Sequence, residues 1–260
     1  MKRLHLFEFE DFEWFPTSIR NYLTDYLQFV SNLFDFYASV IPLLIEGLRA
    51  SHGTTMIDLG SGGGGGLVRV ADQLAAEVTD LQIVLTDLHP NIAAFEATVA
   101  KNPQVFSYRP DKINALDVPP TLTGFRTQFL SFHHFQPQDA QQILQNAVDA
   151  GVPIAIFEGQ KRDINHLVRF ALSPLFVLLF TPFIKPFILG RLVFTYLIPV
   201  VPLVVMWDGV VSVLRTYTAA ELREMTNSLR KGETYHWKIS EAKNGQVTIP
   251  YLLGYPKESL

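Results

Sequence analysis

The chain has 260 residues and a formal charge of −4, so it is long enough to bury the core of one large α/β domain. Its lysines and arginines are scattered, which excludes the basic footprint of a nucleic-acid-binding protein. Cysteine is absent, which excludes disulfides, thiolate metal sites and a cysteine nucleophile. We expect no resident metal. We also expect a cytoplasmic protein, because residues 1–15 are acidic and aromatic, unlike a signal peptide.

Residues 17–49 form the first predicted helical region, because apolar residues recur there at intervals of three and four. We expect two helices that divide near Pro42, since proline interrupts a helix. Residues 55–59 then predict a short buried strand, which is followed by a run of glycines and a helix over residues 67–77.

Strands and helices alternate through the next part of the chain. Further strands are predicted over residues 81–86, 104–108, 127–131 and 153–157, and helices over residues 91–100 and 137–150. An alternation of this length implies a parallel sheet with helices on both faces.

The C-terminal part predicts one more helix and a hairpin. The helix spans residues 218–229 and opens with Thr218 and Glu221 at the spacing of a capping box. Strands over residues 235–240 and 246–253 flank Lys243-Asn244-Gly245, a hairpin turn signal. The predicted fold is therefore α/β: a doubly wound, mostly parallel seven-stranded sheet with an antiparallel C-terminal hairpin.

The glycine run after the first strand predicts a ligand site. Glycines let the backbone approach a ligand closely, and the following helix N-terminus offers unpaired N–H groups. The spacing of Gly60, Gly62 and Gly65 fits a dinucleotide motif, although a glycine-rich turn that binds nothing is the plain structural alternative. Asp58 favours a different cofactor, because a carboxylate beside the loop suits a cationic group and sits badly beside a pyrophosphate.

The segment Asp58-Leu59-Gly60-Ser61-Gly62 resembles the first motif of the class I S-adenosylmethionine-dependent methyltransferases. The resemblance implies that Asp58 and the loop with Gly60, Ser61 and Gly62 hold the methionine part of S-adenosylmethionine. The C-terminal hairpin is also a trait of that family. The likeness covers about residues 54–157 and 218–253, and the chain departs from the pattern in its number of glycines and in a long apolar insertion.

Further cofactor contacts follow from the same resemblance. An acidic residue ends the second strand where the family binds both ribose hydroxyls, and Asp87 takes that role by position. Ala115-Leu116-Asp117-Val118 resembles the segment whose acidic side chain meets the adenine amino group. Leu88 and Ser131 complete the residues that we expect to contact the cofactor.

Three side chains are candidates for catalysis. Methyl transfer from a sulfonium is an in-line displacement, so a base is needed only where the acceptor must lose a proton. His133 and His134 leave the fourth strand at the carboxyl edge of the sheet, where ligands bind in open α/β folds. Either imidazole could deprotonate a hydroxyl, or could only pack in the loop. Glu158, just past the fifth strand, is placed similarly.

Two aromatic and charged groups outside the core are candidates for binding the acceptor, with ordinary packing and ion pairing as the alternative. One group precedes the core, where the family often carries a lid, and the other flanks the C-terminal end of the apolar stretch and returns the chain to the core. The residues are Trp14, Arg20, Tyr22, Trp207, Asp208 and Arg215.

Residues 170–207 are nearly all apolar. The uncharged runs 170–184 and 192–207 fall short of the roughly 20 residues that a helix needs to cross a bilayer, and prolines interrupt them. Strands of one sheet precede and follow this stretch, so we expect no single crossing. A re-entrant or interface-lying hairpin, a cap over a hydrophobic substrate and a homodimer contact are the alternatives.

Together these patterns predict an N-terminal helical lid (residues 1–50) and a methyltransferase core (residues 51–260) with an apolar insertion over residues 164–210. The expected activity is S-adenosylmethionine-dependent methylation of a small hydrophobic acceptor, first of all on oxygen, in the cytoplasm or at the inner face of a membrane. A non-catalytic S-adenosylmethionine-binding protein and an NAD-dependent oxidoreductase are the alternatives, and Asp58 and the terminal hairpin disfavour the second.

Overall fold

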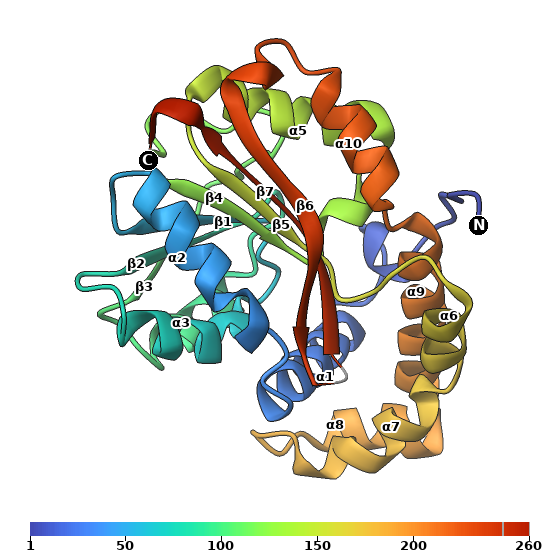
Figure 1. The fold of residues 1–260 in the computed structure, drawn as a ribbon. Helices are drawn as coiled ribbons and strands as arrows, with labels where there is room; N and C mark the ends of the chain where they lie inside the picture. Colours follow the sequence, from blue (N-terminus) through green and yellow to red (C-terminus); the bar gives the residue numbers. More distant parts are fainter. Residues whose placement is uncertain (246, 260) are drawn as a thin grey trace. The chain divides into compact units, whose positions relative to one another are not determined.

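The chain folds into two compact units in the computed structural model, which describes residues 1–245 and 247–259. We call Asp35–Gly159 with Thr218–Leu260 the sheet unit, and Met1–Phe34 with Gln160–Tyr217 the helical unit. The helical unit thus unites the N-terminal segment with the stretch inserted after the fifth strand (Figure 1). Residues 35–50, which the sequence groups with the N-terminal helices, belong to the sheet unit.

A seven-stranded sheet, counted over the described residues, forms the centre of the sheet unit. Its order is β3-β2-β1-β4-β5-β7-β6, and all neighbours are parallel except β5 with β7 and β7 with β6. The strands are β1 (Thr55–Leu59), β2 (Gln82–Thr86), β3 (Phe106–Tyr108), β4 (Phe125–Phe129), β5 (Ile154–Phe157), β6 (Tyr235–Asn244) and β7 (Val247–Pro256). This arrangement confirms the predicted sheet and the fold that the resemblance to class I methyltransferases implied.

The central strands β1, β4 and β5 are almost entirely buried because helices cover both faces of the sheet. In β1, Met56, Ile57 and Leu59 are each at most 1% exposed. The register sets Asp58 opposite Leu85 of β2 and Thr127 of β4. Parallel pairing brings the carboxyl ends of β1, β2, β4 and β5 to one edge, where open α/β sheets bind ligands.

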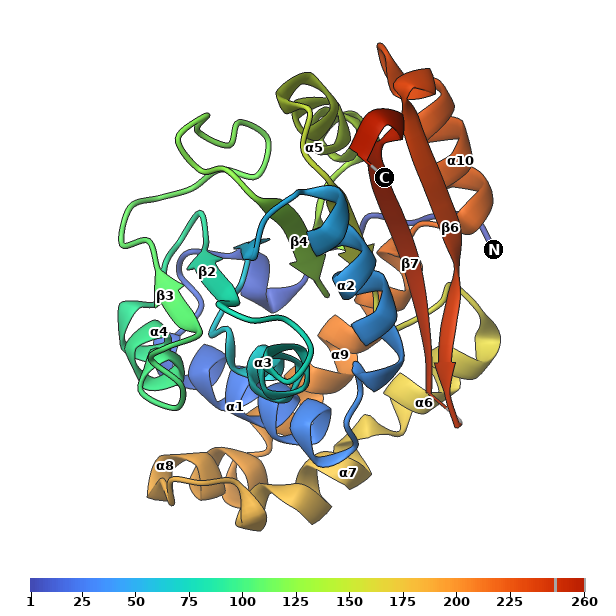
Figure 2. The ribbon, with the colours of Figure 1, turned by 60° about the vertical axis from the view of Figure 1, so that its left-hand side comes forward.

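Two layers of helices flank the sheet (Figure 1, Figure 2). On one face, α2 (Ile41–Ala50), α3 (Val68–Ala75) and α4 (Ile92–Val99) share one apolar core with the strands. On the other face, α5 (Pro137–Ala150) and α10 (Ala219–Asn227) contact each other. The short 3-10 helices of this unit are η2 (Ala38–Val40), η3 (Gly65–Leu67), η4 (Phe132–His134), η7 (Gly232–Thr234) and η8 (Lys257–Ser259).

The helical unit has its own apolar core, to which Leu23, Val177 and Val204 contribute. Two buried arginines reinforce it: Arg191 lies 2.5 Å from Oδ2 of Asp25, and Arg215 binds the N-terminal segment. Its helices are α1 (Thr17–Leu33), α6 (Ile164–Ala171), α7 (Ser173–Phe180), α8 (Leu189–Leu192) and α9 (Val200–Arg215), with the 3-10 helices η1 (Phe9–Asp11) and η5 (Thr181–Phe183) and the π-helix η6 (Val193–Leu197).

No helix in the described part of the chain is long and apolar enough to cross a membrane by itself. Within the helical unit, two pairs of helices have the required length and composition only when taken together, and both pairs are bent. Ile164–Ala171 and Ser173–Phe183 meet at 43°, and Leu189–Leu197 and Val200–Arg215 meet at 75°.

Several predicted boundaries need correction. The first helical region breaks over residues 34–40, and Pro42 lies in the first turn of α2, where its missing N–H costs nothing. The fourth strand covers Phe125–Phe129 instead of residues 127–131, because Leu130 has a positive φ of 53° that ends the extended run. The last described strand begins at Val247, and Gln246, predicted as its first residue, lies outside the described residues. The predicted capping box of Thr218 and Glu221 is present.

Candidate functional site

The glycine loop after β1 is a hydrogen-bonded turn. Gly60 and Gly62 have φ values of 69° and 56°, in the left-handed region that glycine adopts without strain. The N–H of Ser61 donates to the carbonyl of Thr86 at 2.9 Å, and its hydroxyl donates to the carbonyl of Asp58 at 2.9 Å. A Cβ atom at Gly62 would meet nothing within 4 Å. The loop is therefore fixed against β1 and β2 while the space beside Gly62 stays open.

Asp58 is a buried carboxyl group beside this loop. It is 2% exposed, and its Oδ1 accepts a hydrogen bond from the hydroxyl of Thr127 at 3.0 Å. Burial raises the pKa of Asp58 to about 7, hydrogen bonds from Ser61 and Thr127 oppose this rise, and the charge of Asp87 adds to it. A cationic ligand would lower that pKa and gain a buried ionic partner.

Asp87 connects the end of β2 to the glycine loop. Its Oδ2 accepts the N–H of Gly62 at 2.9 Å, and its Oδ1 accepts the N–H of His89 at 2.9 Å. The side chain is half-buried, and each carboxylate oxygen can accept a further hydrogen bond. Asp87 can therefore fix the loop and still receive hydroxyl donors from a ligand. Its neighbour Leu88 is 43% exposed.

Ser131 approaches the loop from the end of β4. Its hydroxyl donates to the carbonyl of Leu59 at 3.4 Å, and a Cβ atom at Gly60 would lie 3.3 Å from the Ser131 side chain. Gly60 is therefore the residue that lets the two segments approach. Asp117 is exposed in the segment between β3 and β4, and its side chain is no part of the hydrogen bonds that link these candidates.

His133 and Glu158 form a buried pair. The Nδ1 atom of His133 lies 2.8 Å from Oε2 of Glu158, and the backbone N–H of His133 donates to Oε1 at 2.9 Å. Their side chains are only 4% and 8% exposed. A carboxylate can only accept, so Nδ1 is the donor in this contact, and Nε2 is the accepting atom when the ring carries one proton. The ring of His134 lies beside that of His133, with centroids 4.4 Å apart.

Tyr37 is a candidate that the sequence does not reveal. It is 3% exposed, its ring packs edge-on against Phe129 at 5.0 Å, and its buried hydroxyl has no hydrogen-bond partner among the described residues. Burial raises its pKa well above the ordinary value, and the charges of Glu158 and Asp58 raise it further. Tyr37 therefore lies near both buried carboxylates and has a hydroxyl that lacks an acceptor.

The residues predicted to bind the acceptor all belong to the helical unit, where most of them hold the N-terminal segment in place. Asp208 accepts the N–H of Phe9 at 2.8 Å, and burial raises its pKa to about 7. Trp207 donates to the carbonyl of Phe7 at 3.0 Å. The same segment receives donors from Arg215 and Arg20.

Trp14 and Tyr22, the other two candidates of this unit, differ in their surroundings. Trp14 is 68% exposed, whereas Tyr22 is half-buried and lies against Gly190, where a Cβ atom would come within 2.4 Å of its hydroxyl oxygen. The structure therefore gives Tyr22 a packing role and leaves Trp14 at the surface.

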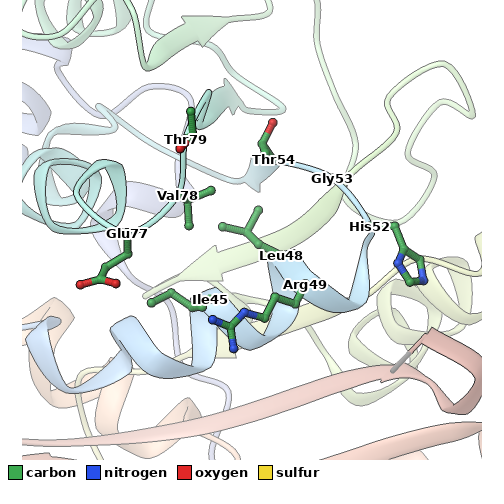
Figure 3. Close-up of a pocket in the computed structure, with 9 residues that line it drawn as sticks. All are labelled: Ile45, Leu48, Arg49, His52, Gly53, Thr54, Glu77, Val78 and Thr79. Atoms are coloured by element: carbon green, nitrogen blue, oxygen red, sulfur yellow. The ribbon is translucent and has the colours of Figure 1, made fainter.

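A cavity of ≈ 400 Å³ opens elsewhere in the sheet unit (Figure 3). Its walls come from α2 and from the loops that precede β1 and β2, so it lies at the amino edge of these strands. The lining residues are Ile45, Leu48, Arg49, His52, Gly53, Thr54, Glu77, Val78 and Thr79. None of the predicted site residues is among them, and the glycine loop lies at the opposite edge.

No family model and no curated protein matches the chain. Among solved structures, similar chains include an O-methyltransferase family protein from Burkholderia thailandensis, with 14% identity and a TM-score of 0.44, which covers 85% of this chain and 56% of that one. The pyocyanin biosynthetic protein PhzM has 12% identity and a TM-score of 0.49, with 85% and 55% covered.

An O-methyltransferase from neocarzinostatin biosynthesis, solved with S-adenosylmethionine and 2-hydroxy-5-methyl naphthoic acid, has 14% identity and a TM-score of 0.45, with 88% and 58% covered. The chain thus spans little more than half the length of these structures.

Proposed function

We propose that the protein is an S-adenosylmethionine-dependent methyltransferase that acts on a hydroxyl group of a small hydrophobic acceptor. The observation that carries the proposal is Asp58, a buried carboxyl group beside a glycine loop that is fixed at the carboxyl edge of the sheet. When bound, S-adenosylmethionine would supply a methyl group on a cationic sulfur, and that sulfur would be the leaving group of an in-line displacement.

The residues of the site fit this cofactor in charge. Its ammonium group would compensate the buried carboxyl group of Asp58, whereas the pyrophosphate of NAD would add negative charge there. Asp87 would receive the ribose hydroxyls, and Ser61 and Gly62 would line the methionine part. The unpartnered hydroxyl of Tyr37 supports the same assignment, because the cofactor carboxylate is an acceptor for it.

We assign the base role to His133. Glu158 holds the ring through Nδ1, so Nε2 can take the proton of the acceptor hydroxyl as the oxygen attacks the methyl carbon. Glu158 is then a positioning residue, and it also stabilises the imidazolium that forms. His134 stacks beside the ring and is the second candidate.

The acceptor is proposed to be hydrophobic because the helical unit exposes many apolar side chains. An acceptor dissolved in lipid would be reached at a membrane surface, and the inner face of a membrane is the proposed place. A homodimer and the adenine contact of Asp117 stay predictions. So do the acceptor contacts of all six residues named for them: Trp14, Arg20, Tyr22, Trp207, Asp208 and Arg215.

A labelled-methyl transfer assay tests this function. The purified protein is incubated with methyl-labelled S-adenosylmethionine and an organic extract of cells, and label in the organic phase is measured. We expect labelled product with the wild-type protein and about 10²- to 10⁴-fold less with His133→Ala. Cofactor binding without any label transfer would instead indicate a non-catalytic binding protein.

A further inference from the structure

The helical unit carries a concentrated apolar surface. Fourteen of the twenty-three exposed large hydrophobic residues in the described part of the chain lie between residues 164 and 203. We call these the apolar face: Ile164, Val168, Leu172, Leu175, Phe176, Leu178, Leu179, Phe183, Phe187, Leu189, Tyr196, Leu197, Ile198 and Leu203. Most come from α7, α8 and the turns beside them, which lie together at one end of the unit (Figure 1).

This exposure is a property of packed helices. In α7, Val177 is fully buried while Leu175 and Leu179 on the same helix are 63% and 58% exposed. On the next segment, Arg191 is 2% exposed, and its guanidinium binds Asp25 and the carbonyl of Ile184. The elements are therefore anchored on their inner side and present large side chains on their outer side.

The charged residues within positions 164–207 all have one sign, and Asp163, which precedes this segment, pairs with His166. Between Asp163 and Asp208 the chain contains no aspartate or glutamate, and its charged residues there are Arg169, Lys185 and Arg191. Because Arg191 is buried against Asp25, the exposed charges are Arg169 and Lys185. An apolar segment whose own exposed charges are cations matches the interface of a membrane with anionic headgroups.

We propose that the apolar face inserts into one leaflet of a bilayer that contains anionic lipid, with Arg169 and Lys185 at the headgroups. A second copy of the chain fits less well, because a two-fold contact through this face would bring together two copies of a segment that carries exposed cations and no aspartate or glutamate of its own. The inference deepens the proposed function, since it names the partner from which a hydrophobic acceptor would be reached. Binding to vesicles nevertheless requires neither cofactor nor acceptor, so it can fail or succeed independently of methyl transfer.

Vesicle flotation tests the inference on the full chain without cofactor. Vesicles of phosphatidylcholine alone are compared with vesicles of equal parts phosphatidylcholine and phosphatidylglycerol. We expect the wild-type protein to float with the anionic vesicles. The pair Leu175→Asn with Leu179→Asn should reduce binding by about tenfold or more, because both side chains would enter the leaflet. Lys185→Gln should reduce binding to anionic vesicles by about fivefold and leave neutral vesicles unaffected.

Leu4→Asn is the matched control, since Leu4 is 45% exposed outside the apolar face and its loss should leave flotation unchanged. Circular dichroism melting checks that each variant is folded, and Phe183→Asn with Phe187→Asn is a second pair if the first unfolds. Failure to float with either vesicle, or flotation that both pairs leave intact, overturns the inference. A sedimenting dimer that the same pairs dissociate would assign the face to a second copy.

Discussion

The Nδ1 atom of His133 lies 2.8 Å from Oε2 of Glu158, and both side chains are buried at the carboxyl edge of the sheet. The contact fixes which nitrogen carries the proton and turns Nε2 into the accepting atom. It joins two residues that are 25 positions apart and that stand at the ends of adjacent strands, β4 and β5.

His133→Ala should lower turnover by about 10²- to 10⁴-fold while cofactor affinity changes little, because the base acts on the acceptor. Glu158→Gln should give a smaller loss in turnover and shift its pH profile, since the amide cannot stabilise an imidazolium. The measurement is kcat against pH, and it includes His134→Ala because His134 is the second candidate for the base. Less than tenfold loss in both histidine variants would reject a base role and leave proximity as the main source of acceleration.

Tyr37→Phe should weaken binding of S-adenosylmethionine by about three- to tenfold and leave the unliganded protein as stable or more stable, because a buried hydroxyl without a partner is removed. Tyr235→Phe is the matched control: the Tyr235 hydroxyl donates to the carbonyl of Ala147 at 3.0 Å, so this variant should lose about 1 kcal/mol of stability and no affinity. Calorimetry and thermal unfolding measure both quantities. Unchanged affinity in Tyr37→Phe would remove the hydroxyl from the site.

Asp58→Asn should become more stable relative to the wild-type protein as the pH rises. Burial raises the pKa of Asp58 from 3.8 to about 7 in the folded state, so ionisation opposes folding. The penalty is absent below about pH 4, grows between about pH 4 and pH 7, and stays constant above that range. Urea unfolding of both proteins across this range tests it, and comparison with the wild-type curve cancels the similar contribution of Asp208. A stability difference that does not change with pH would contradict the buried carboxyl.

Arg215→Met should destabilise the helical unit by about 3 kcal/mol or more, because it removes a buried guanidinium that lies 2.5 Å from the carboxylate of Asp11 and 3.3 Å from that of Glu8. The Arg215 side chain also donates to the carbonyl of Leu6 at 2.7 Å, so the N-terminal segment should loosen as well. Hydrogen exchange of residues 6–11 and thermal unfolding measure the effect. If the variant keeps its stability and only KM for the acceptor rises, Arg215 binds the acceptor instead.

The sequence predicts an element best where local chemistry marks both ends. Helix α5 is predicted at its observed bounds because Pro137 opens it and Gly151 closes it with a φ of 65°. The fourth strand is placed two residues late, because Leu130 follows the apolar Phe129 without a turn residue between them. The positive φ of Leu130 depends on packing that the sequence does not show.

The same distinction holds for the site. Asp58, Gly60 and Asp87 can be predicted because they stand in one motif or at the end of a strand. His133 and Glu158 are predicted singly but not as a pair, because their contact depends on the register of β4 and β5. Tyr37 escapes prediction altogether, since only the packing of the segment before α2 against Phe129 buries its hydroxyl near both carboxylates.

Isothermal titration of the wild-type protein and Asp87→Ala with S-adenosylmethionine, S-adenosylhomocysteine and NAD tests the central claim most directly, with Asp72→Asn as a control at an exposed acidic position of the same unit. The site of Asp58, Gly62 and Asp87 predicts tighter binding of S-adenosylmethionine or its demethylated product than of NAD. It also predicts at least about tenfold weaker binding in Asp87→Ala, from the loss of charge-assisted hydrogen bonds to the ribose. Equal or tighter binding of NAD, or unchanged binding of S-adenosylmethionine in Asp87→Ala, would contradict it.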